Sequence, residues 1–309
     1  MTGATGFLGS HLLARLQCEP LCSEVTIVKR SSSDMGRIAG LLHGIRTFDM
    51  DRHPLKEVFN GKPYDIVLHC ATNYGRGASR AQIVEPNLLL PLRLLDLAVE
   101  SGTKVFVNTD TMLDGKVSNY SLSKSQFREW LRRVGPQMTC IDMVLEHFYG
   151  PGDSRTQFIS SLVYALLDDQ PEIAFTEGMQ ARDFIYIDDV VEAFLCVLRS
   201  AHLQSGYLEY EVGSGHATRL RDIAELVRTL SGNTSTIFHF GALPYRLNEP
   251  MSVAPDISQL KALGWKAKWS LRAGLEETIR AEREILNGRR QQIAMGFTSA
   301  FHNGEQPYV

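Results

Sequence analysis

The chain has 309 residues, of which 44% are hydrophobic and 22% are charged, a composition ordinary for a globular protein with one large or two closely joined domains. The formal net charge is −3 without a basic arm, which excludes nucleic acid as an expected partner. No signal-peptide pattern and no apolar run of about 18 residues occurs, so we expect a cytoplasmic protein that does not span a membrane. The five scattered cysteines favour reduced thiols, and we expect no metal site.

The first chemical signature is the run Thr2-Gly3-Ala4-Thr5-Gly6-Phe7-Leu8-Gly9. Glycines at this spacing allow a tight turn that brings backbone N–H groups against a pyrophosphate. A helix expected from Phe7 to Cys18 would turn its partly positive N-terminus toward the anion. Similar small-residue turns also occur in loops without a ligand. The run predicts a cofactor site with these contacts: Gly3, Thr5, Gly6, Phe7 and Leu8.

The chain in front of this glycine run is unusually short for a nucleotide-binding loop. Such a loop normally follows a buried strand of about five apolar residues, whereas only Met1 precedes Thr2. We therefore expect that the natural reading frame starts upstream. With that strand supplied, the chain begins as strand, loop, helix and strand, the last at residues 24–28.

The residues after the 24–28 strand select the cofactor. An acidic side chain there would bind the ribose hydroxyls of adenosine, whereas a cation suits a 2′-phosphate. This chain has Lys29 and Arg30, followed by three serines. The pattern favours NADP(H) as the cofactor, with NAD(H) possible. If no cofactor binds here, these residues form a solvated basic turn, which is common.

Three further strands are expected before residue 120, at residues 46–50, 65–72 and 105–111. The strand at 65–72 is a continuous apolar run of the kind that parallel sheets bury. Its histidine, His69, is interpreted as a core residue rather than a catalyst. The helix at 88–99 is apolar on nearly every side and therefore needs a partner.

The second chemical signature is Tyr120-Ser121-Leu122-Ser123-Lys124, on a helix expected at about 121–134. A lysine four residues after a tyrosine lies on the same helical face. Its charge favours the phenolate and lowers a pKa that is about 10 in the free side chain. The pair predicts a proton-transfer site.

Taken together in this order, the two signatures resemble the extended branch of the short-chain dehydrogenase/reductase family, the NAD(P)-dependent epimerase/dehydratase type that acts on nucleotide sugars. The resemblance covers roughly residues 1–286. It implies an α/β fold, a Rossmann-type doubly wound parallel sheet with a smaller C-terminal substrate lobe. The expected division is a dinucleotide-binding domain at 1–150 plus about 181–212, a substrate-binding lobe at 151–180 plus 213–287, and an irregular or partner-bound tail at 288–309.

The resemblance also implies roles for single residues. The catalytic group would be Thr109, Tyr120 and Lys124, with the threonine hydroxyl bonded to both the substrate oxygen and the tyrosine. Tyr120 and Lys124 would also contact the cofactor, Lys124 at its ribose. Further residues at the cofactor would be Asp49 and Met50 beside the adenine, Ala71, and Asn87 as a brace. The substrate would be bound by Thr109, His147, Arg182 and Arg246. A homodimer is implied through the helices at about 88–99 and 121–134.

Two departures from the family pattern narrow the expected reaction. The sugar 4,6-dehydratases of the family carry Thr-Asp-Glu, whose glutamate abstracts a proton, whereas this chain has Thr109-Asp110-Thr111 and so lacks that base. Only about ten residues separate Thr109 from Tyr120, fewer than in typical epimerases and dehydratases. This contracted pattern resembles the CDP-abequose and CDP-paratose synthase type of 4-keto-sugar reductase.

The expected function is NADPH-dependent reduction of the C4 keto group of a CDP- or dTDP-activated 6-deoxy or 3,6-dideoxy 4-keto hexose, for surface polysaccharide or glycoside biosynthesis. A nucleotide-sugar 4-epimerase with tightly bound NAD uses the same three residues, and Lys29 and Arg30 count against it. A non-catalytic NADP-binding sensor is the third interpretation, but such proteins lose the Tyr-Lys pair. The residues leave the nucleotide base and the C4 stereochemistry open.

Overall fold

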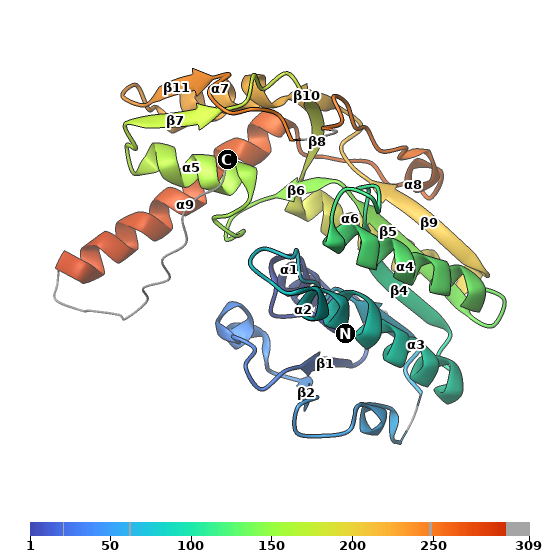
Figure 1. Ribbon diagram of the computed structural model, residues 1–309. Helices are drawn as coiled ribbons and strands as arrows, with labels where there is room; N and C mark the ends of the chain where they lie inside the picture. Colours follow the sequence, from blue (N-terminus) through green and yellow to red (C-terminus); the bar gives the residue numbers. More distant parts are fainter. Residues whose placement is uncertain (21, 62, 247–248, 295–309) are drawn as a thin grey trace. The chain divides into compact units, whose positions relative to one another are not determined.

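The computed structural model describes residues 1–20, 22–61, 63–246 and 249–294, and the chain divides into two compact units (Figure 1). Unit 1 comprises Met1–Glu146, Asp188–Val212 and Pro255–Lys266. Unit 2 comprises His147–Ile187, Gly213–Ala254 and the chain from Ala267 onward. Each unit has its own sheet structure, so the two can be followed separately along the chain.

Unit 1 is built on parallel strands whose order reverses near the N-terminus. On one side, β1 (Val25–Lys29) pairs with β2 (Ile45–Asp49). On the other side lie β3 (Ile66–His69), β4 (Val105–Thr111), β5 (Thr139–Leu145) and β9 (Tyr207–Val212), paired in that order. The expected α/β class with a doubly wound parallel sheet is confirmed.

Met1 and Thr2 join the two halves of this sheet. Thr2 forms parallel bridges to Val28 and to His69. Its N–H donates to the carbonyl oxygen of Leu68 at 2.9 Å, and the N–H of Val28 donates to the carbonyl oxygen of Met1 at 2.8 Å. These two residues therefore occupy the central position of the sheet, beside the point where the strand order reverses. In doubly wound sheets that switch point is where a nucleotide binds, at the carboxyl ends of the strands.

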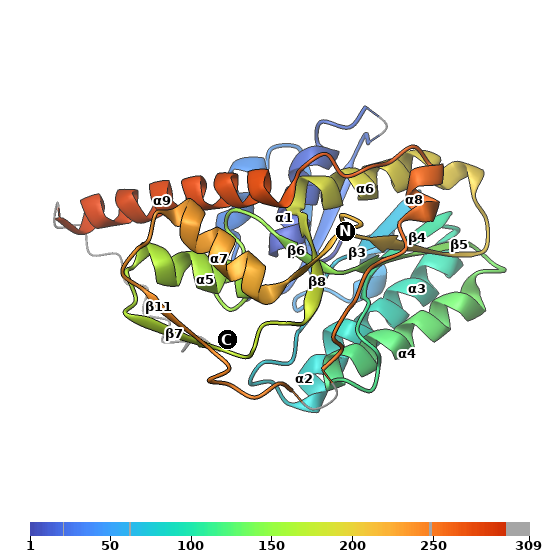
Figure 2. The same cartoon turned by 90° about the horizontal axis from the view of Figure 1, so that it is seen from above.

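Helices cover the sheet of unit 1. Figure 2 shows α3 (Leu90–Ser101) and α4 (Asn119–Val134) beside each other along the strands. Leu94 of α3 and Phe127 of α4 are buried with Phe106 of β4 in one apolar cluster. A second cluster contains Leu13 of α1 (Phe7–Leu16). The remaining helical segments of unit 1 are α2 (Arg80–Val84), η1 (Gly36–Leu41), η2 (Leu55–Phe59), the π-helical η3 (Glu85–Leu89), η4 (Ala201–Leu203), α8 (Ser258–Ala262) and α6 (Ile187–Ser200), whose first residue belongs to unit 2.

The start of α4 is set by Ser118. Its hydroxyl accepts a hydrogen bond from the N–H of Ser121 at 3.1 Å, and the hydroxyl of Ser121 accepts one from the N–H of Ser118 at 3.1 Å. Reciprocal bonds of this kind satisfy two otherwise unpaired groups at a helix N-terminus. The helix therefore begins at Asn119, two residues before the expected start, and Tyr120 lies in its first turn.

The segment 255–266 packs with unit 1, although the sequence assigns it to the C-terminal lobe. The indole N–H of Trp265 donates to the carbonyl oxygen of Asp189 at 3.2 Å, and the side chain of Trp265 is buried. The N–H of Asp256 donates to the carboxylate of Glu211 at 2.5 Å. The segment stays attached to unit 1 because the large Trp265 side chain is buried there while its indole N–H keeps a hydrogen-bond acceptor.

Unit 2 contains two small sheets. The first has β8 (Ala181–Tyr186) between β6 (His147–Tyr149) and β10 (Ala217–Arg219), and the second pairs β7 (Glu172–Phe175) with β11 (Ile237–Phe240). Its helices are α5 (Phe158–Leu167), α7 (Leu220–Ser231) and α9 (Leu271–Ala294).

The last helix is longer than the sequence indicates. The sequence predicts an end at Asn287, yet α9 continues through Gly288 to Ala294. A glycine inside a helix costs about 1 kcal/mol relative to alanine. The guanidinium of Arg290 donates to the carboxylate of Asp168 at 3.0 Å and so holds the added turns. The remainder of the expected tail, 295–309, lies outside the described residues.

Among the described helices, none has the length and apolar character that crossing a lipid bilayer requires. The long α9 illustrates the reason, because its exposed faces carry ion pairs such as Arg280 with Glu277 at 2.6 Å and with Glu284 at 2.7 Å. Charged pairs of this kind at helical spacing are typical of a surface in contact with water.

Asp183 of β8 holds the loop that follows β9. Its carboxylate accepts hydrogen bonds from the N–H groups of Ser214 at 2.8 Å, Gly215 at 2.7 Å and His216 at 3.1 Å. The side chain is fully buried. Hydrogen bonds to a charged group are stronger than those between neutral groups, and a buried donor without its acceptor is costly.

We expect Asp183→Ala to lower the free energy of unfolding by about 3 kcal/mol, because a buried carboxylate and its three hydrogen bonds to backbone N–H groups are lost. Urea unfolding followed by circular dichroism measures the change. Asp222→Ala, which removes an exposed carboxylate on α7, is the matched control and should change stability by less than about 0.5 kcal/mol. Equal effects of the two substitutions would contradict this account of the loop.

Candidate active site

The glycine turn before α1 is packed too closely for side chains. Gly3 has a φ of +69°, and a Cβ there would lie 2.5 Å from the N atom of Ala71. A Cβ on Gly9 would lie 2.0 Å from the carbonyl oxygen of Gly3. Both distances are shorter than any real contact, so glycine is required at each position for the turn to sit against the end of β3 and the first turn of α1.

The N-terminus of α1 suits an anion. Gly6 precedes the helix and has no side chain to cap it, and the first turn, from Phe7 to Gly9, is not acidic. The side chain of Leu8 is buried, so this residue can offer an anion only its backbone N–H. Helix N–H groups and the helix dipole together favour a phosphate at such a position. The residues present therefore fit the pyrophosphate of a dinucleotide.

The loop after β1 is held by Asp49, at the end of β2. The Lys29 ammonium donates to the Asp49 carboxylate at 3.0 Å, and the Ser31 hydroxyl donates to it at 2.9 Å. Burial raises the pKa of Asp49, but the hydrogen bonds from Lys29 and Ser31 outweigh burial, and the pKa lies below its ordinary value. The Lys29 charge is thus paired within the protein, whereas the Arg30 side chain is exposed. Met50, expected at the adenine, is half-buried against the core of unit 1.

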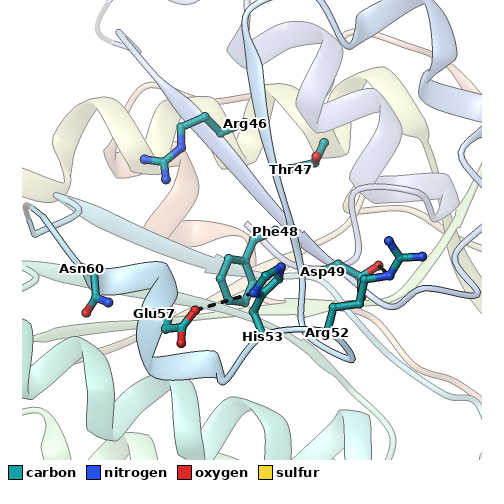
Figure 3. A pocket seen from close by; sticks show the side chains of 8 residues that line it. All are labelled: Arg46, Thr47, Phe48, Asp49, Arg52, His53, Glu57 and Asn60. Atoms are coloured by element: carbon teal, nitrogen blue, oxygen red, sulfur yellow. Dashed lines mark ion pairs between the residues drawn. The ribbon is translucent and has the colours of Figure 1, made fainter.

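An open pocket of about 460 Å³ adjoins this end of the sheet (Figure 3). Arg52 points to Asp49, with 3.8 Å between their charged atoms, and His53 points to Glu57 at 3.7 Å. The pocket shares Asp49 with the loop after β1, so it lies where the sequence places the adenosine end of a cofactor. Its full lining is Arg46, Thr47, Phe48, Asp49, Arg52, His53, Glu57 and Asn60.

Lys124 is a buried lysine, with 1% of its surface exposed. Its ammonium donates to the carbonyl oxygen of Thr109 at 2.7 Å, which joins α4 to β4. Burial lowers the pKa of Lys124, and the nearby carboxyls of Asp110 and Asp142 oppose that shift. The hydroxyl of Thr109 donates to the carbonyl oxygen of His69 at 3.2 Å, which is a different partner from the tyrosine that the family resemblance implies.

Tyr120 is enclosed near the same strand. Burial raises the pKa of its phenol above the ordinary value, and Tyr74 and Asp110 raise it further, whereas hydrogen bonds with the Thr111 and Thr72 side chains lower it. The ring of Tyr74 lies 5.2 Å from the ring of Tyr120. The sequence predicts a lowered pKa for Tyr120, because the prediction takes account only of the lysine four residues away. In the folded protein burial is the largest influence, and it raises the pKa.

Asn87 braces the segment after β3. Its side-chain oxygen accepts hydrogen bonds from the Thr72 hydroxyl at 3.1 Å and the Asn73 N–H at 2.9 Å. Its amide group donates to the Asn73 carbonyl oxygen at 2.9 Å and to the Ser123 hydroxyl at 3.1 Å. One buried amide thus connects the end of β3 to α4. Ala71, also expected at the cofactor, donates its N–H to the Thr2 hydroxyl at 3.3 Å.

The residues expected to bind substrate in unit 2 have different surroundings. Arg182 is buried, and its guanidinium forms an ion pair with Glu249. His147 is exposed at the start of β6, with its ring 5.1 Å from that of Phe184. Arg246 is exposed on the chain that leads to Glu249. Arg246 and His147 are thus exposed to solvent, whereas Arg182 is buried in an ion pair.

A cluster of charged side chains lies one helical turn beyond Lys124, and the sequence analysis did not predict it. It consists of Arg128, Asp110 and Asp142. The guanidinium of Arg128 donates to the Asp110 carboxylate at 2.7 Å and lies 3.5 Å from that of Asp142. Asn108 donates to Asp142 at 2.7 Å. Burial, and then the neighbouring Asp110, raise the pKa of Asp142 well above its ordinary value. The four-residue spacing of Tyr120, Lys124 and Arg128 was the signal that could have revealed it.

The turn, the switch point and the Tyr-Lys helix define the class of the protein. Residues 1–213 match the model of the NAD dependent epimerase/dehydratase family, and the chain belongs to that family, the extended branch of the short-chain dehydrogenases/reductases. The predicted family is thereby confirmed. The protein is an enzyme of the epimerase/dehydratase type, and the family description indicates a nicotinamide cofactor.

Two curated relatives share most of the chain. The CDP-abequose synthase of Salmonella typhimurium is 33% identical over 292 residues, which cover 91% of this chain and 96% of that protein. The CDP-abequose synthase of Salmonella muenchen is 32% identical over 291 residues, with 90% and 96% covered.

Two solved structures share the fold. The UDP-glucose 4-epimerase of Thermotoga maritima has a TM-score of 0.78 at 21% identity. The UDP-glucuronic acid 4-epimerase of Bacillus cereus, as a Y149F mutant in complex with UDP-4-deoxy-4-fluoro-glucuronic acid and NAD, has a TM-score of 0.80, also at 21% identity. Each comparison covers 92% of this chain and 98% of the other. At these identities the structures support the fold alone.

We expect Gly9→Ala to weaken NADPH binding by at least about tenfold, because a Cβ would push the turn away from α1. Fluorescence titration with NADPH measures the affinity, and circular dichroism shows whether the variant folds. Gly40→Ala is the control, because the structure leaves open space around a Cβ there among the described residues. A folded Gly9→Ala protein with unchanged NADPH affinity would contradict the assignment of the turn.

Proposed function

We propose that the protein reduces, with NADPH, the C4 keto group of a CDP- or dTDP-activated 6-deoxy or 3,6-dideoxy 4-keto hexose, for surface polysaccharide or glycoside biosynthesis. The observation that carries the proposal is the pair of half-buried Tyr120 and buried Lys124, whose ammonium donates to the Thr109 carbonyl oxygen near the carboxyl end of β4. The similarity to two CDP-abequose synthases supports a nucleotide sugar as the substrate class.

The raised pKa of the Tyr120 phenol suits the reduction direction. When bound, the cofactor supplies a hydride for C4 of the sugar. Tyr120 donates its proton to O4 as negative charge develops there, and it must start protonated, as burial ensures. The Lys124 cation stabilises the phenolate that remains, and Lys124 would also contact the cofactor ribose. The Thr109 hydroxyl would contact the sugar oxygen.

Dehydration is disfavoured by the surroundings of β4. Thr111 stands where the dehydratases of the family carry their glutamate base. The neighbouring carboxylate, Asp110, is buried and forms an ion pair with Arg128 at 2.7 Å. The ion pair engages this carboxylate with a cation of the protein and does not leave it open to a substrate. These residues favour a reaction that needs an acid, Tyr120, and no carboxylate base.

The two units would have separate roles. Unit 1 would hold the dinucleotide through the glycine turn and the loop after β1. Unit 2 would hold the nucleotide sugar, with Arg246 at the diphosphate, because a planar guanidinium can bind phosphate oxygens through two hydrogen bonds. Arg182 and His147 would contact the remainder of the substrate.

We also propose a homodimer through α3 and α4. Large apolar side chains are exposed on these helices and beside them, including Trp130 at 49%, Leu122 at 46% and Leu89 at 39% of their surfaces. Trp130 and Leu122 are eight residues apart and so lie on one face of α4. Exposed aromatic and aliphatic side chains grouped in this way are typical of an interface between subunits.

We expect the purified protein to consume NADPH with at least one of a panel of CDP-, dTDP-, UDP- and GDP-4-keto-6-deoxy sugars. Tyr120→Phe should lower kcat by about 100-fold or more, because the proton donor is lost. Reduced-nicotinamide absorbance measures turnover, and NMR of the product gives the C4 configuration.

Tyr64→Phe is the matched control for this experiment. It removes a hydroxyl that donates to the Thr26 hydroxyl at 3.1 Å, outside the proposed site, and should leave turnover unchanged. The 4-epimerase is the second candidate. NAD that stays bound through gel filtration, with no NADPH consumption, would favour it and contradict the reductase.

Arg30 should decide the preference for NADPH. Because Lys29 is paired with Asp49, we expect Arg30→Ala to raise the Kd of NADPH by about tenfold and to leave that of NADH nearly unchanged. Isothermal titration with both cofactors measures the two constants. Arg272→Ala, an exposed site on α9, serves as the control. Equal losses for both cofactors in Arg30→Ala would argue against a 2′-phosphate contact.

A further inference from the structure

Tyr74, on the loop after β3, is an aromatic side chain beside Tyr120 that the proposed catalytic group does not include. The centroids of the two rings lie 5.2 Å apart, and the ring planes meet at an angle of 46°. Tyr74 nevertheless keeps 46% of its surface exposed. An aromatic ring that contacts one neighbour and keeps nearly half of its surface open has apolar area left for a ligand.

The backbone on both sides of Tyr74 is fixed by hydrogen bonds. Before it, the N–H of Asn73 donates to the side-chain oxygen of Asn87 at 2.9 Å, and the carbonyl oxygen of Asn73 accepts from the Asn87 amide at 2.9 Å. After it, the N–H of Gly75 donates to the side-chain oxygen of Asn73 at 2.8 Å. Gly75 has a φ of +85°, a conformation that glycine adopts readily, and a Cβ there would lie 3.0 Å from the buried side chain of Ile83. The ring of Tyr74 is therefore held by a rigid loop.

The same Asn87 amide sets the loop of Tyr74 against the helix of Tyr120. It also donates to the hydroxyl of Ser123 at 3.1 Å, and that hydroxyl donates to the carbonyl oxygen of Tyr120 at 2.7 Å. Asn87 and Ser123 are both buried. Because buried hydrogen bonds are costly to break, the loop and the helix cannot shift separately. The two tyrosine rings thus form a pair that is in place before a ligand binds, as is usual for small-molecule sites.

The spacing of the two rings brings Tyr74 within reach of the sugar carbons next to C4. Proton transfer requires O4 within about 3 Å of the Tyr120 hydroxyl. An aromatic ring contacts a carbon atom at about 3.5–4 Å, so a ring 5.2 Å from that of Tyr120 can contact a carbon that is a few bonds from O4. C6 is such a carbon, because it is attached to C5, the neighbour of C4.

An aromatic surface at C6 favours a deoxygenated sugar. A 6-deoxy hexose has a methyl group at C6, and burial of a methyl group against a ring is favourable. A hexose with a hydroxyl at C6 would bring that hydroxyl against the ring, where it loses water without gaining a hydrogen-bond partner. The same ring therefore attracts one sugar and disfavours the other.

We propose that Tyr74 is a specificity-determining residue, whose ring contacts the C6 methyl group of the deoxy sugar and selects it over a sugar with a C6 hydroxyl. This inference rests on the proposed function, which supplies a 6-deoxy hexose with its O4 at Tyr120. The methyl group is common to the 6-deoxy and the 3,6-dideoxy sugars. Because the contact is apolar, it needs the ring of Tyr74 and not its hydroxyl.

The first test compares two substrates in Tyr74→Ala and Tyr74→Phe. One is the nucleotide-linked 4-keto-6-deoxy hexose that the wild-type protein reduces, and the other is the same 4-keto sugar with its 6-hydroxyl. We expect Tyr74→Ala to raise KM for the deoxy sugar about tenfold, with little change in kcat, and to reduce the preference in kcat/KM about tenfold, the effect of about one apolar group. Tyr74→Phe should keep both values of the wild-type protein.

Leu203→Ala is the control, because it shortens an exposed apolar side chain on η4 and should change neither constant. Circular dichroism shows that each variant folds. An unchanged preference in Tyr74→Ala would overturn the proposal. A Tyr74→Phe protein that behaves like Tyr74→Ala would also overturn it, since the hydroxyl would then be the group that binds. A lower kcat with the preference intact would mean that Tyr74 only supports Tyr120, and this too contradicts the proposal.

A second measurement needs no turnover. Isothermal titration can use pairs of CDP- and dTDP-sugars that differ only at C6, 6-deoxyglucose with glucose and 6-deoxygalactose with galactose. We expect the wild-type protein and Tyr74→Phe to bind the 6-deoxy member of at least one pair about tenfold more tightly, and Tyr74→Ala to bind both members of that pair equally. A wild-type protein that prefers no 6-deoxy member, or that binds no pair, would overturn the proposal.

The two measurements separate this inference from the proposed function. If the wild-type protein reduces none of the keto sugars, the proposed function fails, while the titrations still decide whether Tyr74 selects a C6 methyl group. If the wild-type protein reduces a keto sugar and Tyr74→Ala keeps the preference for the deoxy sugar in both measurements, the reductase stands and this inference fails.

Discussion

The burial of the Lys124 ammonium is the constraint on which the rest of unit 1 depends. A buried charge is costly unless hydrogen bonds and nearby charges compensate it. Here the ammonium donates to the Thr109 carbonyl oxygen, and Asp110 and Asp142 favour its charged form. Arg128, on the same face of α4, joins the two carboxyls. The helix and the strands β4 and β5 are thereby held in one relative position, which also sets the position of Tyr120.

The same cluster links chemistry to stability. Arg128 binds the Asp110 carboxylate and the Thr111 carbonyl oxygen together, so the strand end that faces the phenol cannot shift without breaking buried hydrogen bonds. Asn87 has the corresponding role for the segment after β3. Asn87 is buried and Arg128 is half-buried, and both act through groups fixed before any ligand arrives. Pre-organised donors of this kind need no rearrangement when charge develops in a reaction.

The glycine turn and the Tyr-Lys helix lie at the same edge of the sheet, because the strands are parallel and their carboxyl ends share one edge. Thr2 bridges to β1 on one side and to β3 on the other, so the turn that follows it opens at the carboxyl end of the sheet, where β4 also ends. Gly3 allows the turn to lie against Ala71, and Gly9 allows the first turn of α1 to lie against Gly3. A dinucleotide that binds across such an edge extends from the loop after β1 toward the end of β4.

The sequence by itself determined the family, the order of the main helices and strands up to residue 134, the glycine turn and the Tyr-Lys pair, because these depend on local spacing along the chain. Glycine spacing and a four-residue helical repeat are readable without a fold. Only the tertiary structure decided that burial raises the pKa of Tyr120, that Asp49 pairs with Lys29, and that the Thr109 hydroxyl donates to the carbonyl oxygen of His69. Those outcomes depend on desolvation and on side chains from distant segments, whose distances no spacing along the sequence specifies.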